Sequence, residues 1–430
     1  MPLTKEKNEA YIAILKEELL VAMGCTEPIA IAYAAAIVRD ALDELPGEIR
    51  ARLSGNIIKN VKSVIVPATG GLHGIEAAIA AGIVAACPER QLEVLSVLRK
   101  DDQKKIAEFL NTCKISVEEM ESPHTFDLEL IATAGEHTAS VRISGNHTNV
   151  VAVKKDGSDL TPGFRCGHQE EETNQTDRTV LNVQDILTFA TEIPLDEVQP
   201  LLERQVEMNM AIAREGLKGG YGACIGKVLY CDGEASLRDR ARAFAAAGSD
   251  ARMSGCEMPV GILSGSGNQG ITASVPVVVY AQALDKTKEE MLRALLVSDL
   301  ITIHQKTGIG CLSAYCGAIS AGCGCGAGIC YLLGGDYRAI AHTLVNAVAI
   351  LSGTICDGAK PSCAAKIAMA VEAGIMGYEM TKAGYQFYSG DGIVTKGVEN
   401  TIRNVGKLAR DGMSETDKEI IRIMLQPECK

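Results

Sequence analysis

The chain has 430 residues and carries 54 acidic against 42 basic side chains, which gives a formal net charge of −12. This balance argues against nucleic-acid binding, because such proteins need a basic surface that displaces counterions. No apolar run is long enough to span a bilayer, and the N-terminal residues are too charged for a signal peptide, so we expect a cytoplasmic protein without membrane contacts.

The first part of the chain is predicted to be helical. Within residues 1–60, residues 8–22 and 28–43 carry apolar side chains at helical spacing. Between these helices, Gly24 can end the first helix, and Thr26 can cap the second. We expect this N-terminal part to pack on the C-terminal unit.

The next part, residues 61–170, is predicted to be an α+β unit with an antiparallel sheet. Residues 102–113 favour a helix, and the strand-like segments are 61–67, 115–119, 127–134, 139–144 and 148–154. The polar residues 168–179 are typical of an exposed linker. Residues 180–430 then show helical patterns with glycine-rich loops, so the fold class is α+β with a larger, mainly helical domain.

Cys25 directly precedes the second predicted helix. A helix N-terminus favours a thiolate through its dipole and its free N–H groups. A buried thiol beside a turn fits the same residues equally well, so local sequence leaves both interpretations open.

A glycine-rich loop around residues 264–270 precedes a predicted helix that ends near residue 283. Its G-x-G-x-x-G spacing matches a dinucleotide fingerprint, but the neighbouring elements do not form the βαβ unit that such a site needs. The loop and the helix N-terminus instead offer hydrogen-bond donors to an anion. We therefore expect Ser266, Gly267, Asn268 and Gln269 to bind a substrate carboxylate.

Seven of the fifteen cysteines lie between residues 308 and 366. Disulfides are rare in the reducing cytoplasm, so such an excess indicates metal binding, catalysis or burial. Cys356 and Cys363 flank a loop with Asp-Gly and Pro, which places Cys363 in the first turn of a helix. Facing a third cysteine on a neighbouring helix, they would form a three-cysteine cluster site that leaves one iron open to substrate.

Motifs spread along the chain resemble the L-cysteine desulfidase family, which is related to the α-chain domain of iron–sulfur L-serine dehydratases. They are GCTEP at 24–28, GNHTN at 145–149, SDARM at 249–253, SGSGNQGI at 264–271 and ICDGAKPSCAAK at 355–366. The resemblance implies a [4Fe–4S] cluster with three cysteine ligands. Cys356 and Cys363 match two ligands, and Cys316 fits the third best, with Cys311 or Cys323 as alternatives. Cys323 and Cys325 are otherwise assigned to packing.

The family reaction converts L-cysteine and water to pyruvate, ammonia and hydrogen sulfide. It requires a base at the Cα proton, for which Cys25 is the first candidate and Glu27 and His304 are rivals. The resemblance also implies that no pyridoxal phosphate is required. Further predicted substrate contacts are the following: Arg252 or Lys59 as charge partners of the carboxylate, and His147 at the mouth of the site.

Two other functions remain open from the sequence. L-serine dehydration uses the same scaffold, because a hydroxyl and a thiol occupy the same place on the substrate. A non-enzymatic iron–sulfur sensor would use the cluster to detect oxygen, but it would not need the polar glycine loop. The alanine- and glycine-rich helices favour tight packing, either within the chain or between subunits of a homo-oligomer.

Overall fold

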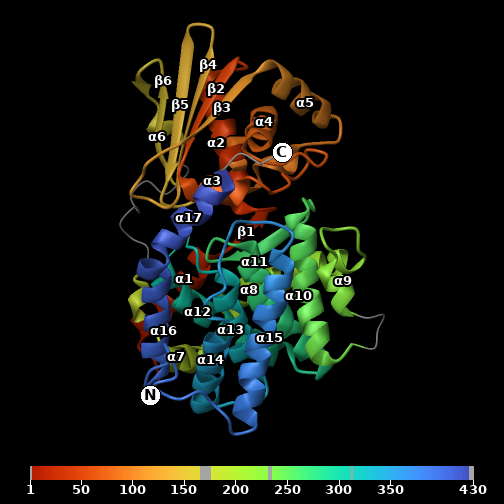
Figure 1. Cartoon of the computed structure of the whole chain (residues 1–430), viewed down its shortest axis with the longest axis vertical. Coiled ribbons are helices and arrows are strands. Elements are labelled where there is room, and N and C mark those ends of the chain that lie inside the picture. The colour runs from red at the N-terminus through yellow and green to blue at the C-terminus, as the bar shows by residue number, and fades with distance from the viewer. Residues whose placement is uncertain (1, 165–175, 231–234, 311–312, 426–430) are drawn as a thin grey trace.

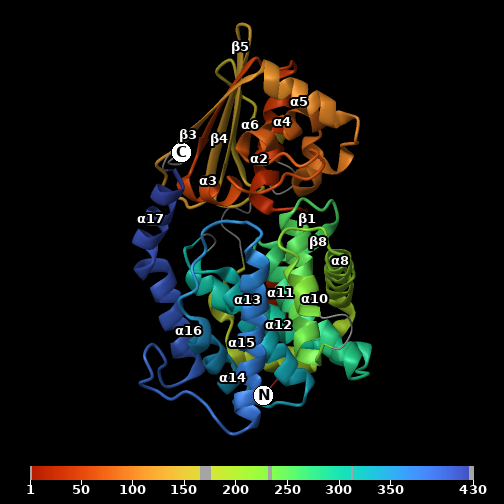
Figure 2. The same cartoon turned by 45° about the vertical axis from the view of Figure 1, so that its right-hand side comes forward.

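The computed structural model describes residues 2–164, 176–230, 235–310 and 313–425. Two lobes are stacked along the longest axis, an upper lobe built on a sheet and a lower lobe built almost entirely of helices (Figures 1 and 2). The predicted α+β class is confirmed. No helix in the described part of the chain has the length and apolar character needed to cross a membrane.

The upper lobe contains a six-stranded sheet in the order β3-β2-β4-β5-β6-β7. Only the β2–β3 pair is parallel among these described strands. The strands are β2 (Glu48–Leu53), β3 (Lys114–Glu119), β4 (Asp127–Ala134), β5 (His137–Ser144), β6 (Val150–Lys155) and β7 (Ser158–Asp159). Figure 2 shows the helices gathered on one side of this sheet, with the other side open.

Alternation of side chains explains this one-sided cover. Ile49, Leu128 and Val141 are buried on the helical side, while Arg52, Glu129 and Arg142 follow one another across neighbouring strands on the open side. The helices of this lobe are α2 (Thr26–Leu42), α3 (Gly55–Val61), α4 (Ile75–Ala85), α5 (Asp102–Thr112), α6 (Thr161–Phe164) and the 3₁₀ helix η1 (Pro88–Val97).

The lower lobe is organised around one buried helix, α13. Its sequence GAISAGCGCGAGICYL has glycines where neighbouring backbones approach, because a Cβ atom added to Gly322 would lie 2.3 Å from the Ala370 carbonyl oxygen. The long helices of this lobe, α13 included, are α7 (Val183–Glu192), α8 (Gln199–Leu217), α10 (Leu237–Met253), α11 (Gly267–Ala283), α12 (Lys288–Ile309), α13 (Gly317–Leu332), α14 (Tyr337–Leu351), α15 (Cys363–Lys382) and α16 (Val398–Lys407). Shorter elements are η2 (Arg178–Val180), η3 (Leu195–Glu197), α9 (Ile225–Tyr230) and η5 (Leu408–Gly412).

Both ends of the chain connect the two lobes. Helix α1 (Lys5–Glu18) lies in the lower lobe, and the chain then crosses to the upper lobe at Gly24 (Figure 1). Near the other end, α17 (Ser414–Leu425) climbs back and packs against α3 of the upper lobe. An ion pair between Lys59 and Asp417 joins these two helices.

Several sequence-based element predictions were wrong. The first helix ends at Glu18, and Leu19–Met23 form strand β1, which pairs antiparallel with β8 (Pro259–Leu263). The predicted strand at 61–67 is not formed, since α3 ends at Val61 and Ile65 makes only an isolated bridge to His73. Strand β2 lies within residues 1–60, which were expected to be helical. The predicted linker lies mostly outside the described residues.

Candidate functional site

A cavity of about 440 Å³ lies between the lobes, and we call it the inter-lobe cavity. In the upper lobe, residues of α2, of α3 and of the loop between β5 and β6 line this cavity. In the lower lobe, it is lined by the turn before α11 and by the first residues of α13 and α15. Of the residues predicted from sequence to form the site, those that line this cavity are Cys25, Glu27, His147, Arg252, Ser266, Asn268, Gln269, Cys316, Cys356 and Cys363. Gly267, His304 and Lys59 do not line it.

Three cysteines line the cavity from different parts of the chain. Cys316 and Cys356 lie on two neighbouring segments, and Cys363 lies at the start of α15. The backbone N–H of Cys316 donates to Thr354 O at 3.0 Å and that of Cys356 to Ala314 O at 2.6 Å, so these segments run side by side. Cys363 is the first residue of α15, as the sequence predicted. Cys316, which was expected on the helix itself, directly precedes α13. Cys311, an alternative third ligand, lies outside the described residues, and Cys323 is buried within α13 and does not line the cavity.

Burial raises the pKa of two of these thiols, Cys316 and Cys363, in the free protein. It raises the pKa of Cys316 to about 12, and the neighbouring Cys356 adds to the effect. Burial also raises the pKa of Cys363. Buried thiols of this kind lose their protons when a metal binds them, so metal affinity at such a site is tied to proton release.

The donor set has the chemistry of an iron–sulfur site, because cysteine thiolates are the usual ligands of such clusters. No three Cys, His, Asp or Glu side chains of the described residues converge closely enough to hold one metal ion. A cluster instead binds each cysteine at a different iron, so its ligands lie farther apart than those of one ion. The inter-lobe cavity also exceeds the space that a small amino acid needs, which leaves room for a cluster beside the substrate.

The loop between Cys356 and Cys363 is held by charged side chains. The Asp357 carboxylate pairs with both Lys360 and Lys366, and Lys366 Nζ lies 2.6 Å from Asp357 Oδ1. Lys366 also donates to Ile355 O at 2.9 Å and lines the inter-lobe cavity. We call Asp357, Lys360 and Lys366 the loop triad. It presets the shape of the loop before any cofactor binds.

Cys25 and Glu27 form a hydrogen-bonded pair at the start of α2. Cys25 Sγ donates to Glu27 Oε2 at 3.4 Å, and Asn60 Nδ2 donates to Glu27 Oε1 at 3.1 Å. Cys25 directly precedes α2 and takes the cap position predicted for Thr26, but its side chain makes no capping bond. Burial, followed by the charge of Glu27, raises the pKa of Cys25 far above its usual value, which favours the buried thiol over the thiolate in the free protein.

The turn before α11 forms the polar wall opposite. Ser264 and Gly265 have positive φ angles of 48° and 75°, which turn the chain sharply into the helix. A Cβ atom at Gly267 would lie 2.4 Å from Arg252 Nε, so only glycine lets the guanidinium pack beneath the helix N-terminus. Arg252 Nε donates to Gly24 O at 3.0 Å, which ties this wall to the crossing between the lobes.

Unpartnered polar atoms also face this region. Asn268 Oδ1, Gln269 Oε1 and His147 Nε2 are buried and have no hydrogen-bond partner among the residues that the structure describes. The His147 ring packs on Phe126 with centroids 4.6 Å apart, and burial lowers the pKa of His147, which keeps the imidazole neutral. Buried polar groups seldom stay unsatisfied, so these atoms are suited to a polar ligand.

Two candidates from the sequence lie elsewhere. His304 Nε2 lies 2.7 Å from Glu399 Oε2, which joins α12 to α16 away from the cavity. Lys59 pairs with Asp417, and its side chain is 1 % exposed. Sequence reasoning missed Asn60 and Lys366 as site residues. Lys366 lay within a recognised motif, whereas nothing in the local pattern singled out Asn60.

The chain is similar to known proteins over most of its length. The family model described as "Serine dehydratase alpha chain" matches residues 89–422. The UPF0597 protein of Desulfitobacterium hafniense (strain Y51) is 53 % identical over 97 % of this chain and 96 % of that protein. UPF0597 proteins of Treponema denticola and Phocaeicola vulgatus are 44 % and 37 % identical, each over 99 % of this chain and 100 % of the relative.

Proposed function

Because this chain belongs to the serine dehydratase alpha-chain family, as its motifs predicted, we propose that it is an iron–sulfur L-cysteine desulfidase. The reaction is a β-elimination that converts L-cysteine and water to pyruvate, ammonia and hydrogen sulfide. The strongest support is the single cavity that three thiols, a carboxylate–thiol pair and an anion-binding helix N-terminus share. A β-elimination needs a group that activates the leaving atom, a base and a binding site for the substrate, and these three features can supply them.

We propose that Cys316, Cys356 and Cys363 hold a [4Fe–4S] cluster. When bound, such a cluster supplies an iron that acts as a Lewis acid on the leaving group at Cβ. The loop triad keeps two of these cysteines at a fixed separation. The proposal requires no pyridoxal phosphate.

The substrate carboxylate is assigned to the wall before α11. Arg252 contributes a buried positive charge, and the N-terminus of α11 adds free backbone N–H groups that favour an anion. The side chain of Ser266 makes no capping bond, so its hydroxyl is available for the substrate. His147 Nε2 and the amide of Gln269 then offer hydrogen bonds to the polar groups at Cα.

Glu27 is the base that the hydrogen bonds favour. Cys25 donates to Glu27, so the carboxylate is the acceptor in this pair and takes the Cα proton. Removal of that proton and loss of the sulfur with its bonding electrons leave aminoacrylate, which tautomerises and hydrolyses to pyruvate and ammonia. Cys25 is the alternative base, as the sequence first indicated. Because the thiol of Cys25 donates to Glu27, we assign it the role of orienting the Glu27 carboxylate.

L-serine dehydration is the second candidate, and the description of the matching family model favours it. The two substrates differ only in the atom that leaves Cβ. A soft sulfur suits iron better than a hydroxyl oxygen does. A non-enzymatic oxygen sensor is less favoured, because it would not need a polar wall that binds an amino-acid carboxylate.

The test uses anaerobically reconstituted protein and measures sulfide and pyruvate from L-cysteine against pyruvate from L-serine. We expect a higher kcat/KM for L-cysteine; a higher value for L-serine would replace the first proposal with the second. Glu27→Gln should lower kcat by about 100-fold to 10,000-fold with its iron retained. Cys25→Ala should keep part of the turnover, and His304→Gln should behave as the unchanged control. Near-normal turnover of Glu27→Gln would transfer the role of base to Cys25.

A further inference from the structure

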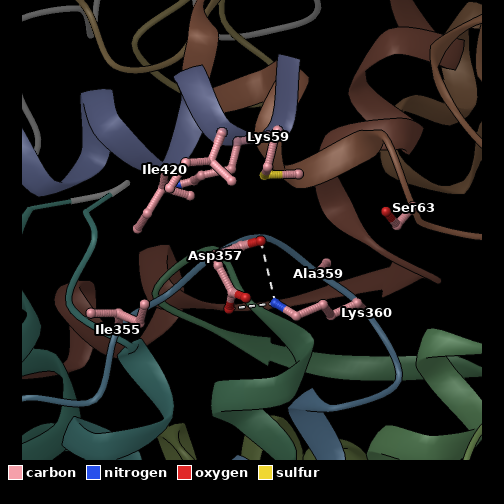
Figure 3. Close-up of a pocket in the computed structure, with 9 residues that line it drawn as sticks. Lys59, Ser63, Ile355, Asp357, Ala359, Lys360 and Ile420 are labelled. Atoms are coloured by element: carbon pink, nitrogen blue, oxygen red, sulfur yellow. Dashed lines mark hydrogen bonds and ion pairs between the residues drawn. The ribbon is translucent and has the colours of Figure 1, made fainter. Parts of the chain in front are cut away.

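A second cavity of about 320 Å³ lies on the other side of the Cys356–Cys363 loop, and we call it the rear cavity. Asp357 and Lys360 line it, whereas Cys356 and Cys363 line the inter-lobe cavity. Figure 3 shows the loop passing beneath α17 and Lys59, with Asp357 and Lys360 on the loop. The loop thus separates the two cavities, and Ala359 lines both of them.

One wall of the rear cavity belongs to the loop triad, which as a group carries an excess of positive charge. In the loop triad, two ammonium groups share the one carboxylate of Asp357. On the opposite wall, Lys59 and Asp417 balance each other. Among the described residues, the triad therefore has one more ammonium group than carboxylates. Asp357 only partly neutralises Lys360, which faces the rear cavity, because Asp357 also pairs with Lys366 on the inter-lobe side. Lys360 can therefore attract an anion.

Apolar side chains form the rest of the wall. Ile420 is buried, while Ile355 and Ile423 are 40 % and 60 % exposed, which is unusual for isoleucine. An inorganic anion would leave these side chains in contact with water. A short aliphatic carboxylate satisfies both features, because its charge meets Lys360 and its chain covers the isoleucines.

We propose that the rear cavity is a regulatory site for a small aliphatic carboxylate that pairs with Lys360. Lys360 Nζ also donates to the carbonyl oxygens of Asp357 and Gly358 at 3.3 and 3.4 Å. A carboxylate that draws Lys360 away releases these three contacts within the loop, so the positions of Cys356 and Cys363 change. This coupling to the cysteines rests on the proposed function, whereas the binding itself does not.

Binding is tested by isothermal titration calorimetry on the full chain without a cluster, in a chloride buffer. Butyrate should bind saturably, whereas butylammonium, its matched cation, should not. Lys360→Met should weaken butyrate binding by roughly tenfold, the usual loss of one charge-assisted contact. Ile423→Asn should weaken it as well, and Lys382→Met, at an exposed lysine outside the cavity, should leave it unchanged.

Two outcomes would overturn the binding site. One is the absence of saturable butyrate binding, or butyrate binding that Lys360→Met and Ile423→Asn leave unaltered. The other is equal affinity for inorganic phosphate and butyrate, because a site built for an aliphatic chain must distinguish them.

Coupling is tested by the rate at which a thiol-specific reagent modifies Cys356 in the same cluster-free protein, read by mass spectrometry. Saturating butyrate should change this rate severalfold in the natural chain and leave it constant in Lys360→Met. A rate that butyrate does not alter would overturn the coupling. Neither measurement uses turnover, so an inactive protein that binds butyrate refutes only the proposed function. Active protein that fails to bind it refutes only the rear site.

Discussion

Cys316 and Cys325 belong to the same helical segment, yet they have different surroundings. Cys316 precedes α13 and faces the inter-lobe cavity beside Cys356. Cys325 lies inside α13, where its thiol donates to Gly322 O at 3.1 Å and neighbouring helices cover it completely. Both are buried, so burial does not separate a candidate ligand from a packing residue. The difference is whether the sulfur faces a cavity or another helix.

Iron binding should show the largest effect of this difference. Cys356→Ala removes a sulfur that faces the cavity, so we expect it to abolish cluster binding. Cys325→Ala removes a packed sulfur and should keep the iron and sulfide content of the natural protein. Both variants are reconstituted anaerobically and assayed for iron and sulfide per chain. Equal iron content in the two variants would contradict the distinction between a cavity-facing ligand and a packed thiol.

Stability should respond more strongly on the packed side of α13. Gly322→Ala places a methyl group 2.3 Å from the Ala370 carbonyl oxygen, so the helices must separate. We expect a loss of about 1–3 kcal/mol in the free energy of unfolding, measured by urea denaturation. Gly47→Ala is the matched control, because its added Cβ atom meets nothing within 4 Å. Similar midpoints for both variants would show that α13 can shift without cost.

The smallest effect belongs to the packed thiol itself. Cys325→Ala leaves a small void among buried helices, so we expect a loss of about 1 kcal/mol in the free energy of unfolding. Cys87→Ala is the comparison, because that thiol is half-buried and contacts the exposed Glu89. It should change stability by less than about 0.5 kcal/mol, as surface changes usually do. A larger loss for Cys87→Ala would contradict the packing assignment.

Sequence-based prediction was more accurate for the antiparallel strands of the upper lobe than for the elements in the first fifty residues. Strand β4 has the predicted ends, and β5 and β6 differ by two residues or fewer, because their apolar residues alternate clearly. Leu19–Met23 continues the helical pattern of α1, but pairing with β8, far along the chain, makes it a strand. Local patterns do not contain such a distant partner.

The candidate site shows the same limit at the level of side chains. Glu27, Arg252 and the cavity cysteines line one cavity, because they lie near the ends of helices or in the loops beside them. His304 was chosen for its chemistry, yet successive residues on a helix point about 100° apart. Ile303 faces the cavity and His304 faces Glu399. Asn60 became a site residue only through the approach of α3 to α2.

The β1–β8 pairing also has a consequence for the order of folding. Strand β1 leaves the ribosome before the entire upper lobe, and its partner β8 follows that lobe. The upper lobe, folding as a unit during synthesis, would bring the two strands closer and lower the entropy cost of closing the loop between them. Cys25 follows β1, and the cysteines proposed as ligands emerge later still. We expect the proposed metal site to be completed only after synthesis has passed α15, so a growing chain would present no finished site to iron.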